Sequence, residues 1–262
     1  MAMPNRLQHC IRVWNYRLTS DMTSFNWLKA VQKHTGKIKA LVFVIALSPL
    51  AIMLIDYHHN NLGIDPLDRI IRDTGSWSLI MLLVTLSITP LRHLLTWLMV
   101  RTKASYGKRT ADWNWIIKMR RMIGLMSSFY AALHLAVYFW LDQGASIDDM
   151  LIDLAERPFL AVGMAAFILL IPVTFTSTNN MMRRLGKNWR RLHRLVYLIA
   201  LLMILHFWML TKVGVYTPMP YILAVFFLLG WRAWFAFSNR PNKIPDDGME
   251  TPPRKFGVPY KK

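Results

Sequence analysis

The stretch KNWRRLHRLVYLIALLMILHFW, residues 187–208, decides the fold class of this chain. Its basic beginning is followed by 16 residues without a formal charge, residues 195–210. This length is close to the ~20 apolar residues that a helix needs to cross a bilayer core. His193 lies near the start of the stretch and His206 deep inside it, and an imidazole in such surroundings needs a polar partner. The stretch therefore predicts a membrane-spanning helix that carries a functional histidine.

The sequence contains five further runs of comparable length without a formal charge. The chain has 262 residues, of which 54% are hydrophobic and only 18% are charged. We therefore expect an all-α integral membrane protein with a bundle of six transmembrane helices. The helices are expected at about 40–56, 76–98, 121–141, 159–177, 192–211 and 218–237. The expected organisation is a basic cytoplasmic tail (1–38), the transmembrane domain (39–238) and a disordered cytoplasmic tail (239–262).

The basic residues are distributed unequally between the two sides of this bundle. The net charge is +18, and 28 of the 32 Lys and Arg fall in segments 1–39, 92–121, 183–194 and 232–262. Those segments lie on one side of a six-helix topology, and cytoplasmic loops are the ones enriched in Lys and Arg. The pattern predicts that both termini are cytoplasmic and explains the positive charge without a nucleic-acid partner. It also predicts contact with anionic membrane lipid.

Some classes of function are excluded by what the sequence lacks. The single cysteine, Cys10, excludes an internal disulfide and a cysteine-based metal cluster. The sequence contains neither a G-x-G-x-x-G motif after a strand nor a phosphate-binding P-loop. The chain therefore has no domain able to hold NAD(P)H, so any chemistry takes place in the bundle or through a partner.

Two connections on the other side of the membrane are expected to be helical. A short surface helix is predicted to start near Asp65, which would cap it, with Pro66 in its first turn. A second is predicted within residues 144–158. Its acidic side is a docking surface outside the membrane or simply a solvated face, and comprises Asp148, Asp149 and Asp153.

Two histidines are predicted to lie at the same depth in the membrane. His134 follows Arg120 by 14 residues, and His206 follows Arg191 by 15 residues. At ~1.5 Å per residue both imidazoles stand roughly 21–23 Å beyond their basic anchors. Two histidines at equal depth on parallel helices suit a haem with two axial imidazoles. The alternative is a pair of histidines that form hydrogen bonds between helices.

His193 is expected to act separately from His206. The two are 13 residues apart, which on an ideal helix is roughly 140° away from a common face. His193 is therefore a candidate ligand of a second haem, with His93 as its partner. A donor site for a flavin or a quinone, and a plain interfacial histidine, remain alternatives.

Six motifs, in this order, carry a resemblance to a known family. They are GIDPLDRIIRDTG (63–75), ITPLR (88–92), RRMIGL (120–125), LHLAVY (133–138), ERPFLAVG (156–163) and TSTNNMMRRLGKNWRRLHRLVYL (176–198). With them the sequence closely resembles the MsrQ family, the haem-binding membrane subunits of bacterial periplasmic methionine sulfoxide reductase systems. It more distantly resembles ferric-reductase-like and NADPH-oxidase transmembrane domains.

The resemblance implies which residues bind cofactor. The family's haem-associated histidines fall on His134, His193 and His206, and the outer haem pair of the wider superfamily corresponds to His134 and His206. The first histidine of the wider superfamily's inner pair falls on Arg120, so one or two haems b are expected. FMN is also implied by the resemblance.

The implied function is electron transfer across the bacterial inner membrane. Quinol from the quinone pool or a cytoplasmic flavin reductase would reduce the haem. A periplasmic molybdopterin reductase resembling MsrP would accept the electrons and repair oxidised methionines in envelope proteins. The chain itself would be a non-catalytic subunit. The alternatives are a stand-alone ferric or quinone reductase and a non-redox membrane assembly protein.

Overall fold

The computed structural model describes residues 34–103, 108–210 and 218–238, and every regular element in this part of the chain is a helix. The long helices are α2 (Thr35–His58), α3 (Pro66–Arg101), α4 (Asn114–Val137), α6 (Pro158–Phe175), α9 (Leu195–Leu210) and α10 (Met219–Ser238). The short ones are the 3₁₀ turn η1 (Thr110–Trp113), the π-helix η2 (Tyr138–Asp142), α5 (Ile147–Glu156), α7 (Asn179–Leu185) and α8 (Lys187–Leu192).

The described residues contain six helical segments that are long and apolar enough to cross a membrane. The side chains that face away from the bundle agree with this, since Phe175, Leu223 and Phe227 are 72%, 68% and 65% exposed. The expected all-α fold with six membrane-spanning helices is confirmed. Most of the expected N-terminal tail and the whole C-terminal tail lie outside the described residues, and α2 already includes residues 35–38.

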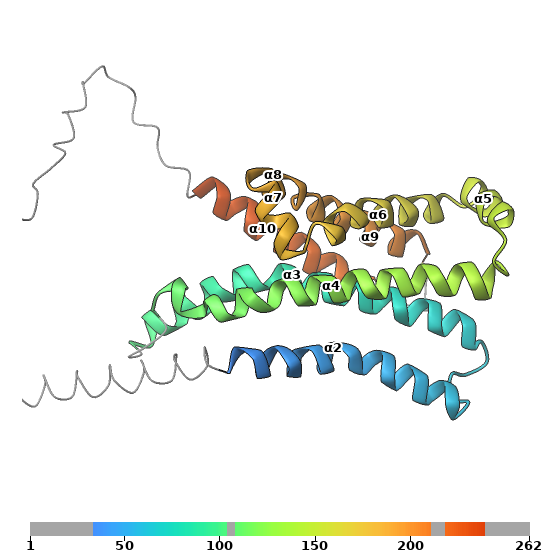
Figure 1. The fold of residues 1–262 in the computed structure, drawn as a ribbon, viewed down its shortest axis with the longest axis horizontal. Helices are drawn as coiled ribbons and strands as arrows, with labels where there is room; N and C mark the ends of the chain where they lie inside the picture. The colour runs from blue at the N-terminus through green and yellow to red at the C-terminus, as the bar shows by residue number, and fades with distance from the viewer. Residues whose placement is uncertain (1–33, 104–107, 211–217, 239–262) are drawn as a thin grey trace, which may run out of the picture.

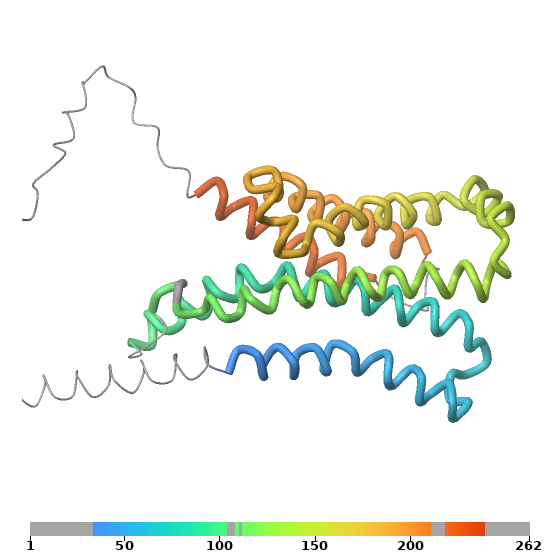
Figure 2. The backbone as a smooth tube through the Cα atoms, viewed as in Figure 1, coloured from blue at the N-terminus to red at the C-terminus, as the bar shows by residue number. Residues whose placement is uncertain are grey.

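The helices form two groups that run the length of the molecule (Figures 1 and 2). Figure 1 shows α2, α3 and α4 on one side and α6, α9 and α10 on the other. The most extensive contacts are those between α3 and α4 and between α6 and α9. We call the end of the bundle that carries α5 the α5 end, and the end that carries α7 and α8 the α7 end.

α3 belongs to both apolar cores of the bundle. Leu79, Leu82 and Leu86 of α3 pack with residues of α6, α9 and α10, whereas Met81 and Ile88 pack with residues of α2 and α4. Because the two sets point to different faces of one helix, α3 joins the two groups of helices.

Two buried serines tie α3 to α4. Ser78 Oγ donates to the carbonyl of Ser127 at 2.9 Å, and Ser127 Oγ donates to the carbonyl of Ser78 at 2.8 Å. Hydrogen bonds between membrane helices of this kind contribute modestly to stability. They also fix the position of α4 along α3, and hence the height at which residues of α4 meet α3.

The start of α3 differs from the expectation in one respect. Asp65 does cap a helix, because its side chain accepts a hydrogen bond from the Asp68 N–H at 3.1 Å, with Pro66 in the first turn. The helix is not a separate surface helix, however. It runs without a break for 36 residues to Arg101, because nothing between Pro66 and Gly75 removes a backbone hydrogen bond.

Pro90 interrupts the backbone hydrogen bonds of α3, and α10 supplies the missing donor. Pro90 has no N–H, so the carbonyl of Leu86 lacks its usual helical partner. Arg232 Nη2 donates to this carbonyl at 2.8 Å, and Arg232 Nη1 donates to Tyr197 Oη at 2.8 Å. A membrane-embedded arginine needs such partners. Arg232 therefore acts as a structural link among α3, α9 and α10.

The fifth membrane-spanning segment is not one continuous helix. α8 ends at Leu192 and α9 begins at Leu195, so His193 lies at the junction between them. The expected helix from 192 to 211 is therefore broken near its beginning. The break separates His193 from the regular turns of α9, which explains why the ideal-helix angle between His193 and His206 does not apply.

One carboxylate of the acidic side of α5 faces the bundle and not the solvent. Asp153 accepts hydrogen bonds from Tyr138 Oη at 3.2 Å and Gln143 Nε2 at 2.9 Å. The expected acidic face of three aspartates is wrong for Asp153, because this carboxylate holds α5 against η2. Asp148 and Asp149 remain exposed.

Candidate functional site

The bundle brings His134 and His206 together. His134 comes from the last turn of α4 and His206 from the last turns of α9. Their ring centres are 6.3 Å apart and the ring planes are inclined by 78°. Both rings line one cavity of about 890 Å³ at the α5 end, which is within the usual range for cofactor and ligand sites.

The same kind of hydrogen bond orients each imidazole. His134 Nδ1 lies 2.8 Å from the carbonyl oxygen of Ile71, and His206 Nδ1 lies 2.7 Å from that of Phe159. A carbonyl oxygen only accepts, so each Nδ1 carries the proton and each neutral ring keeps a lone pair on Nε2. Such a bond is the usual device that orients a metal-binding histidine and fixes its tautomer.

A glycine lets each ring approach the neighbouring helix. A Cβ atom on Gly75 would lie 3.1 Å from Cε1 of His134, and one on Gly163 would lie 2.8 Å from Nδ1 of His206. Each glycine follows the carbonyl residue of its site by four positions, Ile71 in α3 and Phe159 in α6. The two halves of the site therefore use the same arrangement of carbonyl, glycine and histidine.

The separation of the two rings suits two imidazoles on one metal, and each ring also forms a hydrogen bond between helices as the alternative predicts, His134 to Ile71 and His206 to Phe159. An imidazole nitrogen binds a metal at about 2 Å, so ring centres on opposite sides of one iron stand roughly 6 Å apart. The observed separation of His134 and His206 is 6.3 Å. With both Nδ1 atoms as donors, the two Nε2 atoms are both acceptors and cannot bond to each other. Neither Nε2 has a partner among the described residues.

The walls of the cavity are largely apolar, as a porphyrin requires. Leu79, Leu170 and Ile199 line its deep part, and Ala131 and Phe207 flank the two histidines. The residues present fit a haem with two axial imidazoles.

His193 lies in another part of the molecule. It lies at the break between α8 and α9, 13 residues before His206, which is about 20 Å along a helix. Its ring stacks on Trp189 with centres 4.0 Å apart, and its Nε2 lies 3.4 Å from Ser177 Oγ. Its Nδ1 lies 3.2 Å from the carbonyl oxygen of Trp189. The structure does not bring it to the histidine pair.

His93 does not meet His193 in the described part of the chain. Its ring packs against Phe235 of α10, with ring centres 4.4 Å apart. The pairing of His93 with His193 as ligands of one iron therefore has no support in this arrangement.

Several residues of the site were not singled out from the sequence. Gly75 and Gly163 end two of the quoted motifs, and an isolated glycine inside a helix can mark the close approach of a neighbour. Thr74 Oγ1 lies 3.4 Å from His134 Nδ1 and had no such signal. The carbonyls of Ile71 and Phe159 carry none either, because backbone acceptors leave no trace in sequence.

Comparison with known proteins places these features in a family. Residues 74–204 match the family described as ferric reductase like transmembrane component. A "Protein-methionine-sulfoxide reductase heme-binding subunit MsrQ" of Herminiimonas arsenicoxydans is 42% identical over 207 residues, covering 78% of this chain and 87% of the relative. The subunit of that name from Xanthomonas oryzae pv. oryzae is 42% identical over 213 residues, covering 78% and 89%. That from Xanthomonas campestris pv. campestris is 39% identical over 208 residues, covering 77% and 88%.

Proposed function

Because the chain belongs to the MsrQ family of haem-binding subunits, we propose that it binds a haem b between His134 and His206 and carries electrons across the bacterial inner membrane. One observation carries this proposal. Two imidazoles, each with its Nδ1 against a backbone carbonyl of another helix, stand with their centres 6.3 Å apart in one cavity.

A haem bound there would supply a one-electron iron couple. The chain does the rest. His134 and His206 would hold the haem iron through their Nε2 atoms, while the carbonyls of Ile71 and Phe159 orient the two rings and would make them stronger donors. The largely apolar deep walls would limit the contact of the bound group with water.

The direction of transfer follows from the proposed orientation. We assign the α7 end to the cytoplasm, because the segments that meet there contain most of the 32 Lys and Arg. The α5 end, with the histidine pair, then faces the periplasm. Electrons would enter at the α7 end and leave at the α5 end.

The partners on the two sides are of different kinds. Quinol from the quinone pool or a cytoplasmic flavin reductase would supply electrons near the α7 end, where His193 lies. An MsrP-like molybdopterin reductase would take them in the periplasm and repair oxidised methionines. The acceptor is supported by the relatives' names, which make them subunits of a protein-methionine-sulfoxide reductase. The FMN that the resemblance implies takes no step in this proposal.

The proposal is tested by the haem content of histidine variants. We expect His134→Ala and His206→Ala to lose most of the bound haem, measured as the reduced-minus-oxidised absorption spectrum and as haem per chain. His58→Ala and His59→Ala are the matched controls, because both residues are exposed and neither lines the cavity. Equal haem in all four variants would remove the axial ligands from the proposal.

The haem stoichiometry tests the proposed place of His193. One haem per chain in the wild type would leave His193 on the donor side, as proposed. Two would make it a ligand of a second haem. A protein that binds no haem when the cells are supplied with its precursor would belong to the non-redox class instead.

A further inference from the structure

The cavity that holds the histidine pair has a charged rim at the α5 end. Two arginines line it, Arg72 of α3 and Arg157 at the start of α6. Each lies within two residues of a carbonyl that orients a histidine, since Arg72 follows Ile71 and Arg157 precedes Phe159 by two positions. Both guanidinium groups are therefore tied to the same backbone segments as the two imidazoles.

The acidic partner of Arg157 also has other hydrogen-bond donors. Arg157 Nε lies 3.4 Å from Asp153 Oδ1, while Asp153 also accepts hydrogen bonds from Tyr138 and Gln143. A guanidinium has five N–H donors. Within residues 34–103, 108–210 and 218–238, the terminal nitrogens of Arg157 meet no acceptor. Arg157 thus has donors left for a ligand in the cavity.

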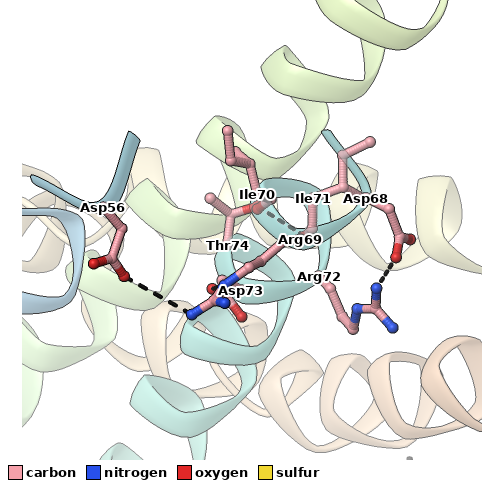
Figure 3. A network of polar contacts seen from close by, with 8 residues as sticks. All are labelled: Asp56, Asp68, Arg69, Ile70, Ile71, Arg72, Asp73 and Thr74. Atoms are coloured by element: carbon pink, nitrogen blue, oxygen red, sulfur yellow. Dashed lines mark hydrogen bonds and ion pairs between the residues drawn. The ribbon is translucent and has the colours of Figure 1, made fainter. Parts of the chain in front are cut away.

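Arg72 can exchange the carboxylate of Asp68 for another carboxylate at little cost. It forms an ion pair with Asp68 one turn earlier on α3 (Figure 3). Exposed ion pairs of this kind contribute little to stability, because water competes for both groups. A carboxylate that entered the cavity could therefore take the place of Asp68.

The other aspartates of the rim already have donors. Asp65 caps α3 through the Asp68 N–H, and Asp142 accepts from Gln143 Nε2 at 3.2 Å. These carboxylates are held at the edge of the cavity and do not need the arginines.

We propose that Arg157 and Arg72 bind the two propionate carboxylates of the haem, so that the carboxylate edge of the porphyrin faces the α5 end. This inference rests on the proposed function. Arg is suited to the role because its planar fork binds a carboxylate through two parallel hydrogen bonds. The porphyrin would then be oriented in the cavity by its iron ligands and by its two carboxylates together.

This orientation has a consequence for the route of the electron. The carboxylate edge would lie under α5, whose Met150 and Leu154 line the cavity. That edge is then the part of the macrocycle nearest to the surface at the α5 end. Two positive charges beside it would also stabilise the reduced iron and raise its midpoint potential, since reduction adds negative charge.

Arg69 provides a matched control on the same helix. It precedes Arg72 by three residues but points toward α2, where it pairs with Asp56 at 3.8 Å, and it also pairs with Asp73 of its own helix at 3.6 Å (Figure 3). It does not line the cavity. Arg69→Gln removes one positive charge from the same end of α3 without touching the rim.

The test compares haem with its dimethyl ester, in which both carboxylates are blocked. The haem-free full-length protein in detergent is titrated with each porphyrin, and binding is followed by the Soret absorption. We expect the wild type and Arg69→Gln to prefer haem over the diester by roughly ten-fold or more, the effect of losing charged hydrogen bonds. The double variant Arg72→Gln/Arg157→Gln should lose this preference through weaker binding of haem, with its affinity for the diester unchanged.

Unchanged diester binding also shows that the double variant is folded. A redox titration of the haem-loaded proteins gives a second readout, in which the midpoint potential falls in the double variant and stays constant in Arg69→Gln. Equal affinity of the wild type for the two porphyrins, or a preference that survives in the double variant, would overturn the inference and leave the proposed function intact. A wild type that binds neither porphyrin would overturn both.

Discussion

Gly163→Ala should displace His206 and weaken haem binding. The added Cβ atom would lie 2.8 Å from Nδ1 and 2.9 Å from Cε1 of the imidazole. Ordinary van der Waals contact begins at 3.4 Å, so the ring must retreat by roughly 0.6 Å, the difference between 3.4 and 2.8 Å. The obstacle is a ring held by its own hydrogen bond, so it cannot simply swing aside.

The displacement affects the hydrogen bond that orients this ring. His206 Nδ1 lies 2.7 Å from the carbonyl oxygen of Phe159, and a retreat of that size brings the distance to roughly 3.3 Å, beyond the usual limit. Losing one such bond costs about 1 kcal/mol, which corresponds to roughly five-fold weaker haem binding. The midpoint potential should rise as well, because the imidazole becomes a weaker donor to iron.

Gly75→Ala and Gly230→Ala complete the series. The Cβ atom at position 75 would lie 3.1 Å from the His134 ring, so the effect should be smaller than at position 163. At position 230 nothing lies within 4 Å, and Ala there should only favour the helix. The assays are haem per chain after purification and a redox titration of each variant. If Gly163→Ala matched Gly230→Ala in haem content and potential, the glycine would not govern the position of His206.

Two further predictions concern the rest of the molecule. Arg232→Leu should lower the free energy of unfolding by about 1–3 kcal/mol, because the Leu86 carbonyl loses its donor. In a Pro90→Ala background residue 90 regains its N–H, so the same substitution should cost less, measured by thermal unfolding in detergent. Equal costs in the two backgrounds would refute the role of Arg232 as donor to the Leu86 carbonyl. Charge reversal at Asp148 and Asp149 should slow reduction of the periplasmic partner without altering the haem spectrum; stopped-flow rates equal to those of the wild type would exclude this face as the docking surface.

The membrane-spanning helices could be predicted from the sequence because the bilayer imposes its own length scale. Uncharged runs of 16 to 25 residues have few alternatives to a spanning helix. The proximity of His134 and His206 followed from the same scale. Once both helices start at the same side, the residue count from a basic anchor gives the depth, and the structure places the two rings 6.3 Å apart.

The positions at which helices break or continue were harder to predict from the sequence. The sequence suggested a separate surface helix at Asp65, whereas α3 continues from it through the membrane. It also suggested an unbroken fifth helix, whereas α8 and α9 are separated at His193. At both positions the helical propensity of the residues allows either a continuous or a broken helix. The packing of the neighbouring helices therefore decides which of the two forms.

The sequence by itself thus determined which segments cross the membrane and which histidines share a depth, because both depend on distances along the chain. Only the tertiary structure decided what each histidine contacts. The carbonyls of Ile71 and Phe159, the inward turn of Asp153 and the supply of an Arg232 donor to the Leu86 carbonyl all join residues far apart in sequence or involve backbone atoms. Backbone groups are the same at every residue, so only the packing of one helix against another selects which of them becomes part of a site.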